Sequence, residues 1–154
     1  MLSFLILSAL AAVSANSHAY DGACPDITPV QNFNLTAYQG RWYGISNLPE
    51  PNQVDGACSQ AEYTLEGDIV KLKNSHVING VLAYIEGTAR FADDANNSAK
   101  LVVTFTFGDL VREAPLIVIS TDYTNYSIAY NCKYDGQTNT HTCNFHLIFI
   151  ILVA

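Results

Sequence analysis

Asn32-Phe33-Asn34-Leu35-Thr36-Ala37-Tyr38-Gln39-Gly40-Arg41-Trp42-Tyr43 holds the only Trp of the chain, where a polar segment changes into a run of alternating residues. From Trp42 onward every second residue shares a face, which is the period of two typical of a half-buried strand. Gly40 permits a positive φ or a close backbone approach, so the Trp can turn inward as the strand begins. We therefore expect a β-strand here, with Trp42 either plugging the end of a small barrel or serving as an ordinary core residue.

Residues 1–15 have the composition of a secretory signal. They are mostly apolar, carry no charged side chain and end in the small residues Val13-Ser14-Ala15. The apolar run is shorter than the roughly 20 residues that a membrane-spanning helix needs, so a membrane anchor is the weaker interpretation. We predict a signal peptide over 1–15 and a single domain over 16–154, secreted into the extracellular space.

The charge balance excludes two classes of partner. The formal net charge is −7 and no basic run is present, so we expect binding neither to nucleic acid nor to an anionic membrane surface. Aromatic residues make up 11% of the chain and charged residues only 14%. That balance suits a β protein with an apolar interior that can hold a cavity.

Four Cys in a secreted chain predict two disulfides, and three pairings remain open among Cys24, Cys58, Cys132 and Cys143. Zinc is the competing interpretation. No two Cys stand at metal-ligand spacing and the four His form no His-Glu-x-x-His pattern, so we expect no metal site. Three sequons fit an exported glycoprotein and, if used, must face solvent; they begin at Asn34, Asn96 and Asn125.

After an irregular, polar segment up to Gly40, the chain alternates strand-like and turn-rich pieces. Asn79-Gly80 and Glu66-Gly67-Asp68 are signals for tight hairpins. Sequential hairpins without a helical pattern between them favour an antiparallel up-and-down barrel, with a β-sandwich as the alternative. The expected strands cover 41–48, 58–65, 69–77, 81–91, 99–107, 115–121, 126–134 and 143–153.

Three groups of residues resemble, in order and spacing, the motifs of the lipocalins. They are Gly40-Arg41-Trp42-Tyr43, Thr121-Asp122-Tyr123-Thr124-Asn125-Tyr126, and Ala23-Cys24-Pro25 with Tyr130-Asn131-Cys132-Lys133-Tyr134. Together with Ile85-Glu86-Gly87-Thr88-Ala89 they are most similar to bilin-binding lipocalins of the insecticyanin type, over about residues 21–136. The resemblance implies an all-β, eight-stranded antiparallel barrel with Gly40, Trp42, Thr121 and Asp122 at its base.

The family pattern also implies a disulfide between Cys24 and Cys132, which would tie the N-terminal strap to the seventh strand of the barrel. Closing a loop of that length contributes on the order of 4–5 kcal/mol in the chain-entropy model, less any native strain. In similar lipocalins the partner of Cys58 lies near the end of a C-terminal segment that this chain lacks. Cys58 and Cys143 therefore stay unassigned.

The tail from Cys143 to Ala154 departs from the lipocalin pattern. A lipocalin would show an eighth strand ending in an Arg that covers the Trp, followed by a helix packed outside the barrel. Here the tail is apolar on both faces and has no such Arg, so it is either a divergent strand or a truncated or misread end. As a strand it would face Phe145, Leu147 and Phe149 inward, and we expect a marginally stable or self-associating protein.

Strand parity and the resemblance together suggest a ligand pocket that is mainly apolar, with a few polar groups near its mouth. Such a mixture suits a flat conjugated ligand whose propionates need a cation. The candidate residues are Asn74, His76, Ile85, Phe105, Phe107, Leu110, Arg112, Asn131 and Lys133.

The chain contains no Gly-x-Ser-x-Gly, no phosphate-binding Gly loop and no His beside a nucleophile at a recognisable spacing, so we expect no enzyme. An exposed Cys58 thiol is the feature that would favour a barrel enzyme instead. We predict a secreted carrier of a small hydrophobic ligand, by resemblance a biliverdin-type tetrapyrrole, with no cofactor required. The alternatives are a carrier of lipid, pheromone or retinoid-like molecules, and a non-functional truncated product.

Overall fold

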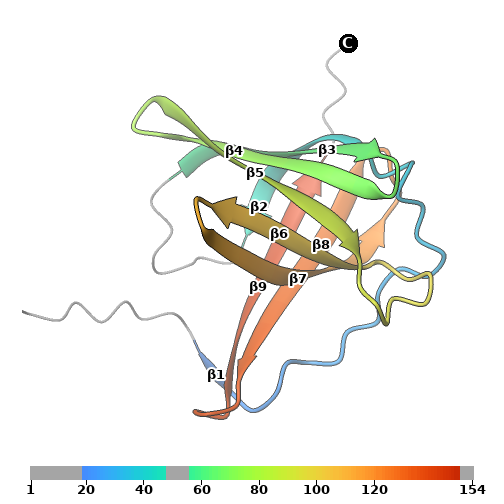
Figure 1. Ribbon diagram of the computed structural model, residues 1–154, viewed down its shortest axis with the longest axis vertical. Coiled ribbons are helices and arrows are strands. Elements are labelled where there is room, and N and C mark those ends of the chain that lie inside the picture. The colour runs from blue at the N-terminus through green and yellow to red at the C-terminus, as the bar shows by residue number, and fades with distance from the viewer. Residues whose placement is uncertain (1–18, 48–55, 150–154) are drawn as a thin grey trace, which may run out of the picture.

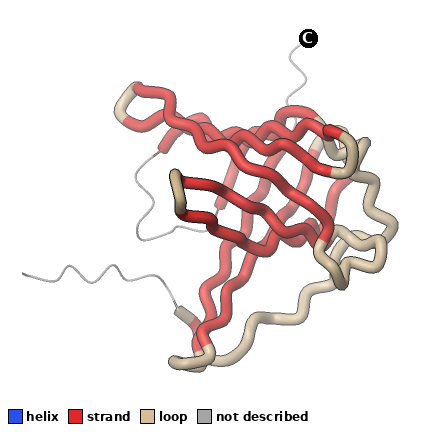
Figure 2. Tube along the Cα trace, in the orientation of Figure 1, coloured by secondary structure: helices blue, strands red, loops and turns tan. Residues whose placement is uncertain are grey.

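The computed structural model describes residues 19–47 and 56–149, and within them the chain forms strands and loops and no helix (Figures 1 and 2). The predicted signal peptide lies outside the described residues. In the described part no helix could span a membrane. The strands are β1 (Tyr20–Asp21), β2 (Gly40–Asn47), β3 (Gly56–Glu66), β4 (Ile69–Ile78), β5 (Val81–Phe91), β6 (Lys100–Phe107), β7 (Leu110–Thr121), β8 (Tyr126–Asp135) and β9 (Thr140–Phe149).

The eight long strands close into an antiparallel up-and-down barrel. Each of them pairs with its neighbours along the chain, and β9 pairs with both β8 and β2, which completes the ring. The predicted fold class is therefore confirmed. Closure leaves no long sheet edge exposed and encloses an interior lined by every second residue.

The inner face is defined by the register that begins at Trp42. Trp42 lies opposite Ala61 on β3, Leu72 on β4 lies opposite Gly87 on β5, and Val118 on β7 lies opposite Ala129 on β8. Paired residues of an antiparallel sheet point to the same face. The buried core follows this face and includes Phe33, Tyr38, Trp42, Tyr63, Val70, Leu72, Ala89, Ala99, Leu101, Val103 and Val118.

The N-terminal strap closes one end of the barrel. Val30 donates its N–H to the Val118 carbonyl at 2.9 Å and accepts from Ala99 N–H at 2.8 Å, so the strap joins the sheet at this point. The turn after Phe33 brings Tyr38 over Trp42, and both side chains are 0% exposed. The tail lacks the Arg that covers this Trp in a lipocalin, and the strap supplies an aromatic cover for Trp42.

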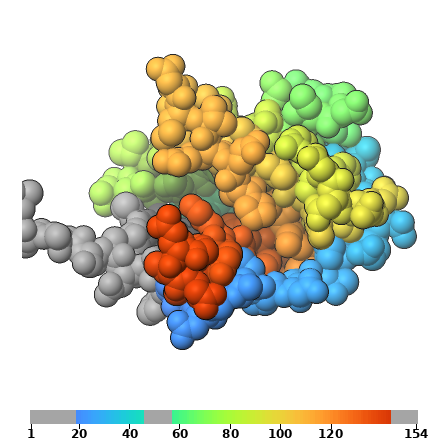
Figure 3. Space-filling view, turned by 60° about the horizontal axis from the view of Figure 1, so that its bottom comes forward, coloured from blue at the N-terminus to red at the C-terminus, as the bar shows by residue number. Residues whose placement is uncertain are grey.

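The opposite end is wider because β5 and β6 pair over only part of their length. β5 pairs with β4 from Val81 to Ala89 but with β6 only from Gly87 to Phe91. The β4–β5 and β6–β7 hairpins consequently diverge (Figures 1 and 2). Figure 3 looks toward this end, where the orange β6–β7 hairpin and the red-orange β8–β9 hairpin stand on either side of a recess.

Two strands begin three or more residues earlier than expected, and one short strand was not expected. β7 begins at Leu110 and not at 115, because Pro115 fits within the strand, opposite Val102, as an exposed residue. β9 begins at Thr140 and not at 143, since the β8–β9 ladder extends to Asp135. The strap also contains the short strand β1, which pairs with β9 and was expected to be irregular.

The backbone register of the tail differs by one residue from the expected one. The register pairs Ile148 with Ser127 and with Gly44, two positions on the inner face. It pairs Phe145 with Tyr130, on the outer face that also carries Cys132. The prediction took its parity from residue type, and an apolar run of this kind does not distinguish its two faces.

Candidate functional site

All nine predicted pocket residues lie on the inner face of the barrel. The register pairs Asn74 with Ile85, Phe105 with Arg112 and Phe107 with Leu110. His76 lies two residues beyond Asn74 on the same face of β4, opposite Ala83. On β8, Asn131 and Lys133 continue the inward series that contains the buried Ala129.

These residues form a gradient from the middle of the barrel to its open end. Asn74, His76, Ile85, Phe105 and Asn131 are half-buried. Nearer the open end Phe107 is 53% exposed, and Leu110, Arg112 and Lys133 are exposed as well. The inner face is therefore enclosed in its middle, where Ile85 and Phe105 lie among polar side chains, and charged at its mouth, which is typical of a site for an elongated amphiphilic ligand.

Asn74 carries the clearest sign of an unmet interaction. Its Oδ1 atom is buried and has no hydrogen-bond partner among the described residues. A buried acceptor left unpaired costs about 1–3 kcal/mol. This cost is recovered if a donor on a bound molecule reaches the oxygen.

The two cations of the inner face differ from the other basic residues. Neither Arg112 nor Lys133 forms an ion pair with any residue that the structure describes. The other five basic residues pair with carboxylates as Arg41–Glu62, Lys71–Glu66, Lys73–Glu86, Arg90–Asp93 and Lys100–Asp94. Arg112 and Lys133 are thus available to an anionic group at the mouth.

The predicted base motif builds the closed end. Gly40 has a φ of 113°, a conformation that favours glycine, and it starts the strand that carries Trp42. Asp122 Oδ1 accepts hydrogen bonds from the N–H groups of Thr124, Asn125 and Tyr126, and Asn125 Nδ2 donates to Oδ2. The Asn125 side chain and these N–H groups lower the pKa of Asp122 well below its ordinary value. Its role here is to hold the β7–β8 turn.

The structure joins Cys24 to Cys132, as the resemblance implies, with an S–S distance of 2.08 Å. Cys58 is a free, exposed thiol at a bulge of β3, and Cys143 is a free thiol on β9. Cys58 is therefore not part of the enclosed interior that a barrel enzyme would use. The three sequon residues Asn34, Asn96 and Asn125 are all exposed.

A second concavity lies on the outer surface of β3, β4 and β5. It is an open groove of about 500 Å³ whose lining includes Glu62, Lys71, Lys73 and Glu86. Two of these residues, Lys73 and Glu86, pair with each other at 3.5 Å. The groove is lined by paired charges, so the inner face remains the better site for an apolar ligand.

Sequence reasoning missed the strap residue Tyr38 and its partner. The Tyr38 hydroxyl and Ser127 Oγ lie 2.8 Å apart and both side chains are buried. Desolvation raises the pKa of Tyr38 above its ordinary value and that of Tyr63 to about 12. The feature of the sequence that could have identified Tyr38 is its position, four residues before Trp42 at the edge of the alternating run.

Comparison with known proteins agrees with this geometry. Insecticyanin-B of Manduca sexta is 40% identical over 146 residues, covering 92% of this chain and 71% of that protein. Bilin-binding protein of Pieris brassicae is 41% identical over 141 residues, covering 92% and 74%. Apolipoprotein D of Cavia porcellus is 37% identical over 136 residues, covering 85% and 70%.

The solved structure of insecticyanin from Manduca sexta superposes with a TM-score of 0.81 at 39% identity, covering 87% of this chain and 72% of that one. Residues 39–146 match the family described as lipocalin / cytosolic fatty-acid binding protein. This match spans most of the barrel, from β2 into β9. The chain therefore belongs to the lipocalin / cytosolic fatty-acid binding protein family.

Proposed function

We propose that this lipocalin is a secreted carrier of a biliverdin-type tetrapyrrole, held in the barrel interior without reaction. Its family is one of binding and transport proteins, so carriage of a small hydrophobic ligand is its general function. The observation that supports a bilin is the buried, unpaired Oδ1 of Asn74 on the inner face. A linear tetrapyrrole offers pyrrole N–H donors along its length, whereas a fatty-acid carboxylate at neutral pH only accepts hydrogen bonds.

The remaining groups of the inner face fit the other parts of such a molecule. Phe105, half-buried opposite Arg112, supplies apolar and stacking contact to a flat conjugated chain. The propionates would lie at the mouth, where Arg112 and Lys133 offer charge-assisted hydrogen bonds to carboxylates. A relative at 41% identity carries the name bilin-binding protein, which supports the same ligand class.

The test is titration of the purified protein with biliverdin, followed by visible absorption and by quenching of Trp42. We expect Asn74→Leu, which keeps the branched shape of the side chain and removes the acceptor, to weaken biliverdin binding about tenfold. Binding of a fatty acid should stay unchanged. Thr88→Val on the outer face of β5 is the control and should bind both ligands as the wild type does.

Two results would contradict the proposal. If Asn74→Leu weakened both ligands equally, the oxygen would contribute no specific hydrogen bond. If the wild type bound fatty acid or retinoid tightly and biliverdin not at all, the carrier would belong to the lipid class.

Export is the second part of the proposal. The disulfide between Cys24 and Cys132 suits an oxidising compartment, and the exposed sequons are accessible to glycosylation. Expression of the full chain in insect cells tests this. We expect protein in the medium that begins at Asn16 and loses mass with an N-glycosidase; retention inside the cells would contradict it.

A further inference from the structure

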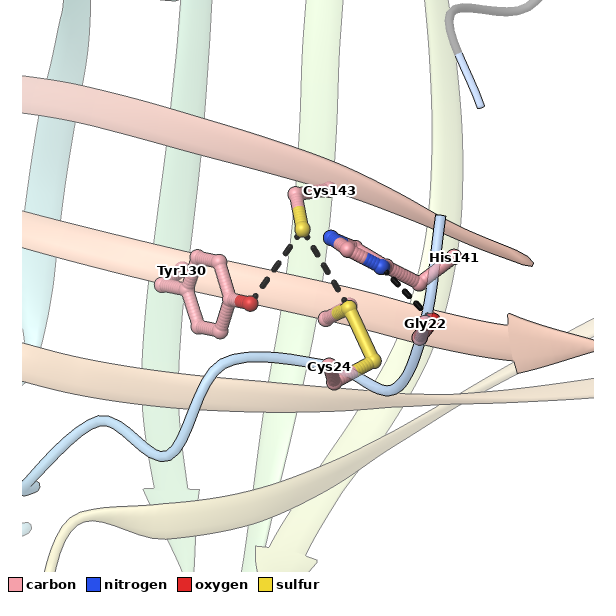
Figure 4. The surroundings of a disulfide bond; sticks show 6 residues. Gly22, Cys24, Tyr130, His141 and Cys143 are labelled. Carbon is pink, nitrogen blue, oxygen red and sulfur yellow. Dashed lines mark hydrogen bonds between the residues drawn. A yellow bond between two sulfur atoms is a disulfide. The ribbon is translucent and has the colours of Figure 1, made fainter. Parts of the chain in front are cut away.

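Three sulfur atoms meet on the outer face of the barrel, where the strap crosses β8 and β9 (Figure 4). Cys132 and Cys143 are directly paired across the two strands. The Cys143 Sγ lies 3.2 Å from the Cys132 Sγ, which is bonded to Cys24. A free thiol is thus in contact with one sulfur of a disulfide.

The imidazole of His141 lies beside the Cys143 thiol (Figure 4). His141 Nδ1 lies 2.9 Å from the Gly22 carbonyl, and since a carbonyl only accepts, Nδ1 carries the hydrogen. The other ring nitrogen then holds the lone pair and points toward Cys143 (Figure 4). The Sγ atoms of Cys132 and Cys143 and a ring nitrogen of His141 all lie within 4.8 Å of one another. The imidazole is placed to accept the proton of the thiol.

Tyr130 completes the surroundings. Its hydroxyl lies 3.2 Å from the Cys143 Sγ, and its side chain is buried. Burial, with the neighbouring sulfur, raises the pKa of Tyr130 above its ordinary value, so the phenol keeps its hydrogen at neutral pH. A phenol O–H that faces a sulfur stabilises the thiolate form by donating to it.

We propose that this cluster is a thiol–disulfide exchange centre in which Cys143 displaces Cys24 from Cys132. The proton of the Cys143 thiol passes to His141, and the thiolate attacks the Cys132 sulfur. A Cys132–Cys143 bond forms as the Cys24–Cys132 bond breaks, and Cys24 leaves as a thiolate that takes up a proton. One disulfide and one thiol are present before and after, so no external oxidant or reductant is consumed.

The product is sterically accessible. Directly paired residues of antiparallel strands have Cα atoms about 4.5–5.5 Å apart, within the range that disulfides span. The strap would then remain attached through β1 and through the Val30 hydrogen bonds, while Cys24 between them becomes a free thiol. The two isomers differ in whether the strap is covalently tied to the barrel.

The experiment uses Cys58→Ser, so that the exposed thiol of Cys58 does not exchange between molecules. The folded protein is incubated with N-ethylmaleimide at pH 7.5 without reductant, digested, and mapped by mass spectrometry under non-reducing conditions. We expect alkylated Cys24 together with a Cys132–Cys143 peptide, and the fraction of molecules with alkylated Cys24 should be at least ten times that in the variant without Cys143. The matched variant Cys58→Ser/Cys143→Ser should show Cys24–Cys132 alone.

A third variant tests the role of His141. His141→Gln keeps a donor for the Gly22 carbonyl but offers no ring nitrogen as base, and we expect alkylation of Cys24 to slow about tenfold. Circular dichroism checks that each variant folds. The proposal is overturned if Cys24 stays unmodified while Cys143 becomes fully alkylated, or if Cys24 is alkylated equally without Cys143.

Discussion

The Tyr38 ring stacks on the Trp42 indole, with ring centroids 4.9 Å apart and an interplanar angle of 29°. The Trp42 Nε1–H also donates to the Tyr38 carbonyl at 3.0 Å, so the strap satisfies the polar group of the indole as well as covering its face. Tyr38 in turn reaches Ser127 on β8. One strap residue therefore links the first and seventh strands of the ring at its closed end.

Tyr38→Phe tests this link. The substitution keeps the stacked ring but leaves the buried Ser127 hydroxyl without the Tyr38 oxygen, and we expect a loss of about 1–2 kcal/mol in the free energy of unfolding. Urea unfolding followed by Trp42 fluorescence measures it. Tyr84→Phe, an exposed Tyr on the outer face, is the control and should match the wild type. Equal stability of Tyr38→Phe and the wild type would show that the bond to Ser127 contributes nothing.

Gly87 allows β5 and β6 to approach closely. A Cβ at this position would collide with the Thr104 carbonyl oxygen and lie 2.8 Å from Phe105 Cδ1. Since β5 and β6 pair only from Gly87 onward, Gly87→Ala should separate them and cost about 1–3 kcal/mol. Gly136→Ala is the control, because its Cβ would meet only an ordinary contact at 3.6 Å. Thermal unfolding of the two variants measures the difference in stability. Equal melting temperatures would show that β6 can move away from the added Cβ without loss of stability.

The hairpin signals, strand parity and the resemblance to lipocalins together were sufficient to predict the order of the strands and the inner face. Local patterns failed where distant segments decide the structure. β1 exists only because it pairs with β9, more than 100 residues later in the chain. The strand expected over 115–121 begins at Leu110, because its ladder with β6 runs from Leu110 to Ile117.

For the candidate site, the sequence predicted which residues lie on the inner face but not the contacts that they make. Alternation placed Asn74 and Phe105 on the inner face, but no local pattern shows that the Asn74 oxygen is left without a partner. The cover of Trp42 was also hidden, since it depends on the path of the strap. The register of the tail could not be predicted either, because a run that is apolar on both faces does not show which face points inward. The pairing with β8 and β2 decides it.

Phe105→Ala should weaken binding of biliverdin by about 1–3 kcal/mol, because the variant loses apolar and stacking contact. Phe107→Ala should have the smaller effect, since Phe107 is already 53% exposed. Val111→Ala, on the outer face of β7, is the control. Fluorescence titration gives the three affinities. Wild-type affinity in both Phe variants would mean that the ligand does not contact this face of β6.

Self-association remains a prediction, and the hairpins at the open end add a second structural basis for it beside the apolar tail. Leu82 is 61% exposed and Val111 is 56% exposed, and both lie on the outer face near the open end. We expect Leu82→Lys/Val111→Lys to lower the fraction of dimers and larger species without changing ligand affinity. Sedimentation velocity over a range of concentrations measures this. A wild type that is monomeric at every concentration would contradict the prediction.

Tyr63 makes a contribution to the stability of the barrel that is lost at alkaline pH. Burial raises its pKa to about 12 in the folded state, whereas an unfolded Tyr ionises near 10. Its contribution is complete below pH 10 and is lost as the pH rises toward 12, because the unfolded chain releases the proton first.

Tyr63→Phe removes this titration and keeps the ring that packs edge-on against Tyr38 at 5.4 Å. The variant should therefore show a smaller loss of stability than the wild type between pH 7 and pH 11, by about 1 kcal/mol. Urea unfolding at both pH values, with Tyr84→Phe as the control, measures the loss. If the wild type and Tyr63→Phe lose stability in parallel, the Tyr63 hydroxyl ionises as readily in the barrel as in the unfolded chain.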